Sequence, residues 1–264
     1  MQMVSAWHAT FVSILSIISP SSAHRTSPHN GNLTQSIPGL EAIPGLTVLT
    51  PSSPSYAAVR ETFIINNATI PLAIARPQNA TQVAEIVRYA VGHGIPITVR
   101  AGGHELFGRS VVTGALAIDL RDIKYVNVLP GQSLAQIGGG AITADYADAL
   151  AQYGLVTPFS TVTSLGFGWN TIGGYSLFSG HYGLGVDQIV AAKVVNWAGE
   201  IVEADADMLF GIRGAQGNFG VIVELTVKVY PLKTVSFVIH VPEVLKLLML
   251  DRFLEGRFCS NLAT

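Results

Sequence analysis

A histidine at the end of a glycine loop is the most chemically suggestive feature of the sequence. The loop consists of Arg100, Ala101, Gly102, Gly103 and His104, and it directly follows a segment with the pattern of a strand. Two successive glycines let backbone N–H groups turn toward an anion such as a pyrophosphate, and His104 would then point into the same cleft. On spacing alone, a tight turn with a surface histidine fits equally well.

Three further glycine-rich stretches strengthen the functional interpretation. They cover residues 138–140, 164–174 and 213–220, and each lies beside an expected helix or strand. Glycine lets backbone approach another group closely, because it has no β-carbon. Four such loops therefore favour one extended ligand that is covered by backbone from two halves of the chain.

Composition and motifs argue against several other classes of protein. Charged residues make up 12% of the chain, the net charge is -2, and the 15 Lys and Arg residues form no run. We therefore expect no nucleic-acid partner, because phosphate binding needs clustered cations. The first expected strand is not followed by G-x-G-x-x-G, and G-x-S-x-G is absent, which disfavours a Rossmann domain and a hydrolase. The seven histidines show no metal-ligand spacing, and the single cysteine, Cys259, allows no disulfide within the chain.

The first loop is positioned by an expected α/β unit. Residues 72–75 predict a short buried strand, and 95–99 and 115–120 predict two more. Between the first two strands, apolar residues at helical spacing predict a helix that Asn79 caps, with Gln82 completing a capping box. Strand, helix and strand in this order are typical of a small α/β unit.

The following region predicts an antiparallel sheet with helices. We expect a helix over 144–153 with Thr143 as its cap, and strands over 191–196 and 200–204 joined by a hairpin turn. Residues 221–230 alternate between apolar and polar side chains, which predicts a half-buried strand. Its apolar face would consist of Val221, Val223, Leu225, Val227 and Val229.

Nine short stretches between about residue 50 and residue 232 occur in the order of one known family. They are Arg76-Pro77, residues 100–104, 108–110, 118–120, 138–141, 153–155, 166–174, 182–184 and 213–220. As a series they resemble the PCMH-type FAD-binding domain, and within it the berberine-bridge-enzyme-like oxidoreductases of the vanillyl-alcohol-oxidase superfamily. The resemblance implies an α+β fold with a small α/β subdomain and a larger antiparallel-sheet subdomain with helices. It also implies FAD as the cofactor.

The resemblance implies that His104 bonds covalently to the 8-methyl carbon of the flavin. That carbon is electrophilic in one tautomer of the flavin, and a neutral imidazole nitrogen can add to it. Val162 stands where many members have a cysteine as second attachment point, so single attachment is expected. The positions expected to contact the cofactor are His104, Arg100, Ala101, Gly102, Gly103, Gly108, Gly166, Gly168, Gly173, Gly174 and Val221.

Several polar and aromatic residues near these positions have alternative interpretations. Trp169 and Tyr175 replace family glycines and place bulk near the expected flavin. For Trp169 we favour packing over stacking on a ligand. For Asp119 we favour a capping role over catalysis, and for His181 a contact with flavin or substrate is the less favoured alternative.

These observations predict five regions along the chain. They are a probable signal peptide over 1–23, a linker over 24–45, two FAD-binding subdomains over 46–125 and 126–232, and a remnant of a substrate domain or an aberrant tail over 233–264. The apolar run near the N-terminus is too short for a stable membrane span. The expected location is the secretory pathway, with the cytoplasm as alternative.

The resemblance implies an oxidase that transfers a hydride from a small molecule, a sugar or a secondary-metabolite intermediate, to FAD, which dioxygen reoxidises. In the family a substrate domain follows and supplies a tyrosine base. That domain is largely absent here, so the chain is expected to be truncated and its catalytic base is unknown. The alternatives are a non-catalytic flavin-binding remnant or pseudoenzyme, and a fragment that does not fold. The oligomeric state stays open.

Overall fold

The computed structural model describes residues 37–64, 66 and 68–232. The predicted signal peptide, most of the predicted linker, the predicted tail and Cys259 lie outside these residues. Described residues up to Tyr230 belong to one compact unit. Within the described ranges, no helix combines the length and the apolar character that crossing a bilayer requires.

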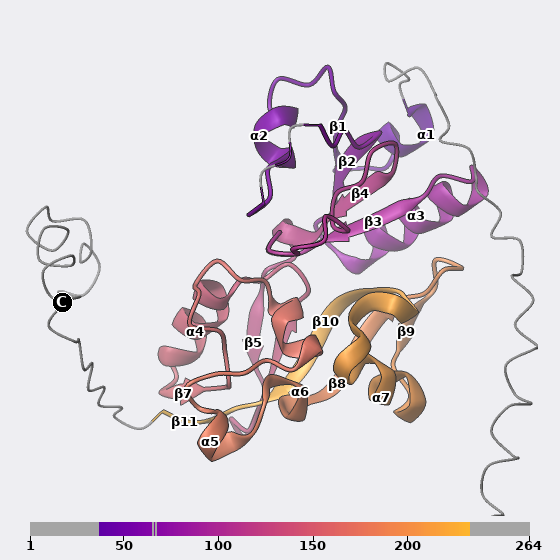
Figure 1. The fold of residues 1–264 in the computed structure, drawn as a ribbon. Coiled ribbons are helices and arrows are strands. Elements are labelled where there is room, and N and C mark those ends of the chain that lie inside the picture. Colours follow the sequence, from indigo (N-terminus) through magenta and orange to yellow (C-terminus); the bar gives the residue numbers. More distant parts are fainter. Residues whose placement is uncertain (1–36, 65, 67, 233–264) are drawn as a thin grey trace, which may run out of the picture. The chain divides into compact units, whose positions relative to one another are not determined.

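The first subdomain contains a four-stranded sheet with one long helix packed on it (Figure 1). Three of its strands are parallel, and the fourth, at one edge, pairs antiparallel with its neighbour. The strands lie in the order β1 (Thr47–Leu49), β2 (Ala73–Arg76), β4 (Leu116–Asp119) and β3 (Ile97–Arg100), and the helix is α3 (Ala80–Gly92). The predicted α/β unit is confirmed.

Helix α3 is positioned by its N-terminal hydrogen bonds and by an apolar face. The Asn79 side chain accepts a hydrogen bond from the Gln82 backbone N–H at 3.0 Å, which confirms the predicted cap. The Gln82 side chain accepts a hydrogen bond at 2.7 Å from the N–H of Gln78, the residue before the cap, and not from the cap residue itself. The expected capping box is therefore displaced by one residue. The buried face of α3 packs against the sheet and against Val195, Val221 and Val223 of the second subdomain.

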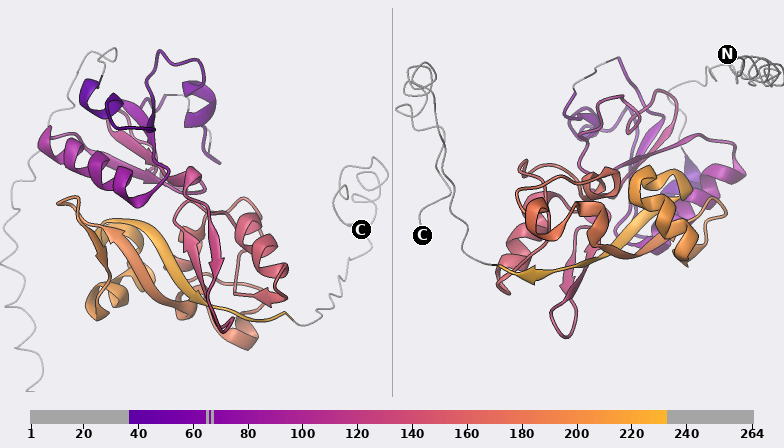
Figure 2. Two further views of the ribbon diagram at one scale, coloured as in Figure 1. Left: turned by 180° about the vertical axis from the view of Figure 1, so that it is seen from behind. Right: turned by 60° about the horizontal axis from the view of Figure 1, so that its bottom comes forward.

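The second subdomain contains a five-stranded, wholly antiparallel sheet (Figures 1 and 2). Helix α4 packs beside β5 and helix α7 beside β8 (Figure 2). The strands lie in the order β5 (Val126–Val128), β6 (Leu134–Gly138), β10 (Val221–Lys228), β8 (Ile189–Val195) and β9 (Ile201–Glu203), and the helices are α4 (Thr143–Ala151) and α7 (Ala206–Ala215). The α+β fold class with two subdomains is confirmed.

Shorter elements connect these sheets. They are α1 (Pro38–Glu41), α2 (Tyr56–Arg60), β7 (Leu155–Val156), α5 (Ser179–Tyr182), α6 (Gly185–Gln188), β11 (Tyr230–Pro231), and the 3-10 helices η1 (Leu120–Asp122), η2 (Phe167–Ile172) and η3 (Gln216–Phe219). Thr143 is the first residue of α4 and not its cap. The cap position is held by Ile142, whose N–H donates to the Asp145 carboxylate at 3.0 Å.

Two sequence expectations differ from the structure. Residues 37–45 were expected in the linker, but Leu40 is fully buried in the first core, so packing begins before residue 46. Strand β10 was expected to be half-buried, but Glu224 on its polar face is also buried, because Tyr125 and Lys193 bind its carboxylate. A β-bulge between Ile222 and Glu224 divides the expected apolar face: Val221 and Val223 join the first core, and Leu225, Val227 and Val229 the second.

Candidate functional site

The loop at residues 100–104 and the loop at 164–168 meet backbone to backbone. A β-carbon on Gly102 would lie 2.8 Å from the Gly166 Cα, and one on Gly166 would lie 3.0 Å from the Gly102 Cα. Both positions therefore require glycine because of each other. The contact joins two of the four glycine-rich stretches that the sequence singled out, one from each subdomain, and it fixes the surroundings of His104.

His104 is half-buried and held from two sides. Its Nε2 lies 2.9 Å from the Ser164 Oγ, and its ring stacks on Phe63 with centroids 4.6 Å apart and planes 20° apart. The Phe63 N–H in turn donates to the Gly103 carbonyl at 2.9 Å. Burial lowers the pKa of His104 below its ordinary value of 6.5, so the imidazole is neutral near pH 7. A neutral, oriented imidazole can act as a nucleophile.

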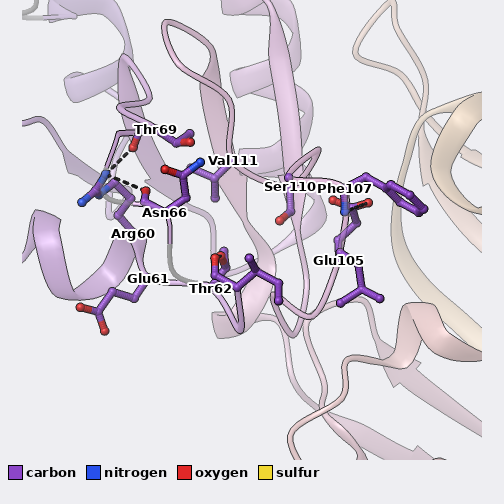
Figure 3. A pocket seen from close by; sticks show the side chains of 12 residues that line it. Arg60, Glu61, Thr62, Asn66, Thr69, Glu105, Phe107, Ser110 and Val111 are labelled. Carbon is purple, nitrogen blue, oxygen red and sulfur yellow. Dashed lines mark hydrogen bonds between the residues drawn. The ribbon is translucent and has the colours of Figure 1, made fainter.

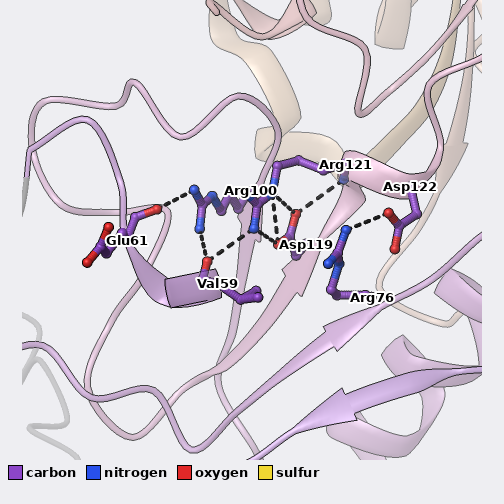
Figure 4. Close-up of polar contacts among 7 residues, drawn as sticks. All are labelled: Val59, Glu61, Arg76, Arg100, Asp119, Arg121 and Asp122. Carbon is purple, nitrogen blue, oxygen red and sulfur yellow. Dashed lines mark hydrogen bonds and ion pairs between the residues drawn. The ribbon is translucent and has the colours of Figure 1, made fainter. Parts of the chain in front are cut away.

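Arg100 is engaged with the protein rather than turned toward a ligand (Figure 4). Its side chain is buried, and its guanidinium donates to the backbone carbonyls of Val59 and Glu61. Burial, and then repulsion from Arg121, lower the pKa of Arg100 to about 10. The Arg100 Nε is buried without a hydrogen-bond partner among the described residues, so a contact between Arg100 and a pyrophosphate stays a prediction. Gly103, at φ 78°, could carry no side chain, because a β-carbon would lie 2.9 Å from the Arg100 Nε.

A second arginine anchors the same segment. Arg121 Nη2 donates to the Val59 carbonyl at 3.1 Å and to the fully buried Asp119 carboxylate at 2.5 Å (Figure 4). Asp119 also accepts from the Arg121 backbone N–H at 3.2 Å at the start of η1, which confirms its capping role. Arg100 ties the end of α2 to the glycine loop, and Arg121 ties the same end to η1.

Two of the four glycine-rich stretches contain glycines that serve packing within the protein. β-carbons on residues 138–140 would strike the backbone carbonyls of Ile123, Ile222 and Leu120. In the 213–220 stretch, a β-carbon on Gly220 would strike the Val195 carbonyl. These glycines let strands approach one another and need no ligand to explain them. The sequence could not separate this cause from close approach to a cofactor.

Glycines that face open space help to locate the candidate ligand surface. A β-carbon on Gly174 would lie 2.8 Å from the Gly185 Cα and 3.0 Å from the Asn170 Cα, so Gly174 packs within the protein. By contrast, β-carbons on Gly108, Gly168 and Gly173 would have no described heavy atom within 4 Å, apart from their chain neighbours. Gly214 and Gly217 are equally open. We take Gly108, Gly168 and Gly173 as the candidate ligand surface because they lie on or close in sequence to the two loops that meet at Gly102 and Gly166.

The remaining expected contact residues divide into buried and exposed ones. Val221 belongs to the first core, so its side chain serves packing rather than the cofactor. Val162, Tyr175 and His181 are exposed. Trp169 is half-buried, and its indole N–H is buried without a hydrogen-bond partner among the described residues. A ligand acceptor would satisfy that donor.

The sequence did not indicate a cavity of about 230 Å³ that is lined in part by the residues that follow His104 in the chain (Figure 3). Glu105 on its wall accepts hydrogen bonds from the backbone N–H groups of Phe107 and Arg109, at 2.9 and 2.5 Å. Burial alone would raise the pKa of Glu105, but the bonds from Arg109 and Phe107 outweigh burial and lower it. Small-molecule sites usually have about 300 to 1,000 Å³, so the cavity can take a small group but not a whole dinucleotide. It is lined by Arg60, Glu61, Thr62, Ile64, Asn66, Thr69, Glu105, Leu106, Phe107, Gly108, Ser110 and Val111.

Comparisons with known proteins agree with a flavin site. A family signature described as an FAD binding domain matches residues 71–205. FAD-linked oxidoreductase aurO of Gibberella zeae is 37% identical over 199 residues, which are 74% of this chain and 39% of the relative. (R)-6-hydroxynicotine oxidase of Paenarthrobacter nicotinovorans is 33% identical over 190 residues, which are 70% of this chain and 42% of that protein.

Solved structures extend the similarity to the fold. The crystal structure of 6-hydroxy-D-nicotine oxidase from Arthrobacter nicotinovorans superimposes with a TM-score of 0.67 at 32% identity, over 70% of this chain and 42% of that one. Physcomitrella patens BBE-like 1 superimposes with a TM-score of 0.70 at 25% identity, over 74% and 44%. The chain therefore belongs to the FAD-binding-domain family that includes the berberine-bridge-enzyme-like FAD-linked oxidoreductases. It spans about two fifths of the length of these relatives.

The residues at the site fit FAD. The loops at 100–104 and 164–168 present backbone from both subdomains, and His104 offers a neutral nitrogen beside them. β-carbons on Gly168 and Gly173 would meet open space, and the buried Trp169 N–H has no hydrogen-bond partner among the described residues. FAD is therefore the cofactor that agrees both with the family and with the groups that these loops offer.

Proposed function

We propose that the protein holds FAD through a single covalent bond to His104 and serves as an oxidoreductase of the oxidase type. The observation that carries the proposal is the imidazole itself: half-buried, bound to Ser164, stacked on Phe63 and kept neutral by burial. Val162, at the position of the family's second attachment point, has no nucleophilic group, which supports attachment at one residue only.

The chain's own residues bind and orient the cofactor. Backbone N–H groups of Gly102 and Gly103 would hold the pyrophosphate, while Arg100 keeps their loop in place through Val59 and Glu61. When bound, FAD supplies the chemistry: it accepts a hydride from an alcohol, amine or similar carbon centre, and dioxygen reoxidises it with formation of hydrogen peroxide. His104 prevents loss of the cofactor between turnovers.

Denaturation tests the covalent bond directly. Purified protein is reconstituted with FAD and unfolded, and flavin fluorescence is read in the polypeptide band of a denaturing gel. We expect fluorescence in the wild type and in His93→Ala, whose histidine is an exposed helix-end residue, but none in His104→Ala. Flavin that separates from the unfolded wild-type chain contradicts the bond, and bonded flavin in His104→Ala moves it elsewhere.

A non-catalytic flavin-binding protein is the second candidate. It rests on the described residues, which provide loops that suit a flavin but no side chain to which we assign the role of a substrate base. Two relatives are named as oxidases of 6-hydroxynicotine and of tetrahydroberberine, so cyclic amines are the first substrates to test, followed by sugars. Anaerobic loss of the flavin absorbance on adding a substrate supports the oxidoreductase. A stable yellow protein that no substrate reduces supports the second candidate.

The secretory location stays a proposal based on residues 1–23. Expression of the full sequence with and without this segment in a secreting host tests it. Appearance of the protein in the medium only when the segment is present supports a signal peptide.

A further inference from the structure

We propose that Asn79 is an acceptor site for an N-linked glycan, and that the same side chain still caps helix α3 in the glycosylated protein. The inference concerns a modification of the surface and is independent of the flavin chemistry. It rests on entry into the secretory pathway, the one part of the proposed function that it uses. Neither the family resemblance nor the comparisons assign a modification to this position.

The sequence around Asn79 has the pattern that secretory glycosylation requires. Asn79, Ala80 and Thr81 form the motif Asn-x-Thr, with a residue other than proline in the middle. The same motif begins at Asn32 and at Asn67, which lie outside the described residues. A three-residue motif also arises by chance, so the case for Asn79 depends on its surroundings in the fold.

The two residues that define the motif are both at the surface. Asn79 and Thr81 are exposed, and Asn79 stands just before helix α3, which is labelled in Figure 1. Its backbone is extended, with φ -157° and ψ 168°. An N-linked glycan is bulky and solvated, so an asparagine that carries one in a folded protein has to be exposed, as Asn79 is.

The two ends of the Asn79 amide have separate roles. The Oδ1 atom accepts the hydrogen bond from the Gln82 N–H at 3.0 Å and so caps α3. The Nδ2 atom has no partner among the described residues. A glycan is bonded to Nδ2 and leaves the amide carbonyl unchanged. The cap bond and the glycan can therefore exist together on one side chain.

The backbone beside the cap is held by Gln82 and not by the Asn79 Nδ2. The Gln82 side chain accepts a hydrogen bond from the Gln78 N–H at 2.7 Å and donates one to the Pro44 carbonyl at 2.8 Å. These two bonds fix the segment that leads into α3. Attachment of a sugar to Nδ2 consequently breaks no hydrogen bond of the described residues.

The transfer balances with an oligosaccharide linked to a lipid pyrophosphate, the donor that the secretory pathway supplies. A C–N bond forms between the Asn79 Nδ2 and the anomeric carbon of the first sugar. The bond between that carbon and the pyrophosphate oxygen breaks, and the lipid pyrophosphate leaves with its electron pair. Nδ2 loses one proton. The step involves no oxidation or reduction, so the flavin takes no part in it.

Mass spectrometry of the secreted protein tests the site. The full chain carries Asn32→Gln and Asn67→Gln, so that one motif remains, and is expressed in a secreting eukaryotic host. One version keeps residues 1–23, and in a second version a leader of the host replaces them. We expect the mass of a glycan on the peptide that contains Asn79. The glycan should be lost in Asn79→Asp and in Thr81→Ala, and kept in Thr81→Ser, which preserves the motif.

Urea denaturation tests the double role of the side chain. Asn79→Asp is the matched variant, because aspartate keeps a cap oxygen but has no amide nitrogen. The glycosylated protein should unfold at the same urea midpoint as Asn79→Asp, whereas Asn79→Ala, which loses the cap, should unfold at a lower one. A glycosylated protein as unstable as Asn79→Ala would mean that the glycan displaces the cap bond, and would overturn the double role.

The outcomes separate this inference from the proposed function. Secreted protein with an unmodified Asn79 overturns the glycan site. A glycan that appears only with the host leader supports the site and contradicts the signal peptide at residues 1–23. Covalent flavin is read on the same protein by gel fluorescence. A glycosylated protein without bonded flavin supports the glycan site and contradicts the bond at His104.

Discussion

Arg100→Met distinguishes an arginine that supports the glycine loop from one that binds the cofactor. The structure has its guanidinium on two backbone carbonyls, Val59 and Glu61. Methionine has similar length and no donors. The FAD-free protein should therefore lose stability, whereas a pyrophosphate ligand would affect only the FAD-bound state.

Two opposing free-energy contributions set the size of the effect. Hydrogen bonds from a charged donor contribute about 1.5–3 kcal/mol each, so two of them contribute about 3–6 kcal/mol. Burial, and then Arg121, lower the pKa of Arg100 from 12.5 to about 10; at about 1.36 kcal/mol per pKa unit, holding the charge costs about 3 kcal/mol. Val59 keeps a second bond, from Arg121. We expect a net destabilisation of about 1–2 kcal/mol.

Urea denaturation of FAD-free protein measures this difference, as a lower midpoint with an unchanged slope. Arg109→Met is the matched control, because the Arg109 side chain is 70% exposed and should contribute within about 0.5 kcal/mol. FAD affinity is measured in parallel in a His104→Ala background. Unchanged urea stability of Arg100→Met together with lost FAD affinity would refute the reasoning and restore Arg100 as a ligand.

Three further predictions concern the core, the attachment and its pH dependence. Leu40→Ala should lower the free energy of unfolding by about 2–5 kcal/mol in urea denaturation, because Leu40 is fully buried. Leu177→Ala is the control, since Leu177 is 59% exposed and its loss should have a small effect. Equal, small effects of the two variants would contradict the prediction. The double variant His104→Ala, Val162→Cys should carry covalent flavin on denaturing gels, since a thiolate can add to the flavin where valine cannot. If its flavin separates on denaturation, position 162 is excluded as an attachment point. The rate of bond formation should rise with pH and be half-maximal below pH 6.5, because burial lowers the pKa of His104 and its neutral form reacts; a midpoint above this value would contradict the neutral imidazole.

The charged groups near His104 do not reverse the direction of that pH effect. The Arg100 guanidinium packs beneath Gly103 and carries positive charge at neutral pH, which favours a neutral imidazole. The Glu105 carboxylate is occupied by bonds from Phe107 and Arg109. Measurement of the rate from about pH 5 to about pH 8 covers the range in which histidine titrates.

Local patterns predicted the secondary structure well, because each depends on neighbours along the chain. The Asn79 cap and the apolar face of α3 are examples. The β10 bulge was not predictable, since a two-residue period describes only a regular strand. Leu40 was missed because a single apolar residue among polar ones carries no periodic signal.

The sequence singled out residues of the candidate site but not the residues that hold them in place. His104 and its glycines stand together in the sequence, and the structure brings them to Gly166 as one surface. Phe63 and Ser164, which hold the imidazole, come from distant segments with ordinary sequence patterns. The support that Arg100 gives to its own loop was not predicted, because its carbonyl partners lie about 40 residues earlier. Only the fold brings them to the guanidinium.

The mutual dependence of Gly102 and Gly166 has a consequence for biosynthesis. During translation the first loop and His104 leave the ribosome about 60 residues before the second loop, and until then nothing presses against Gly102. The histidine acquires its working environment only when the later segment has emerged and folded back. Loading of flavin would therefore follow folding of both subdomains, and a chain interrupted between the two glycines would stay unlabelled however much cofactor the cell holds.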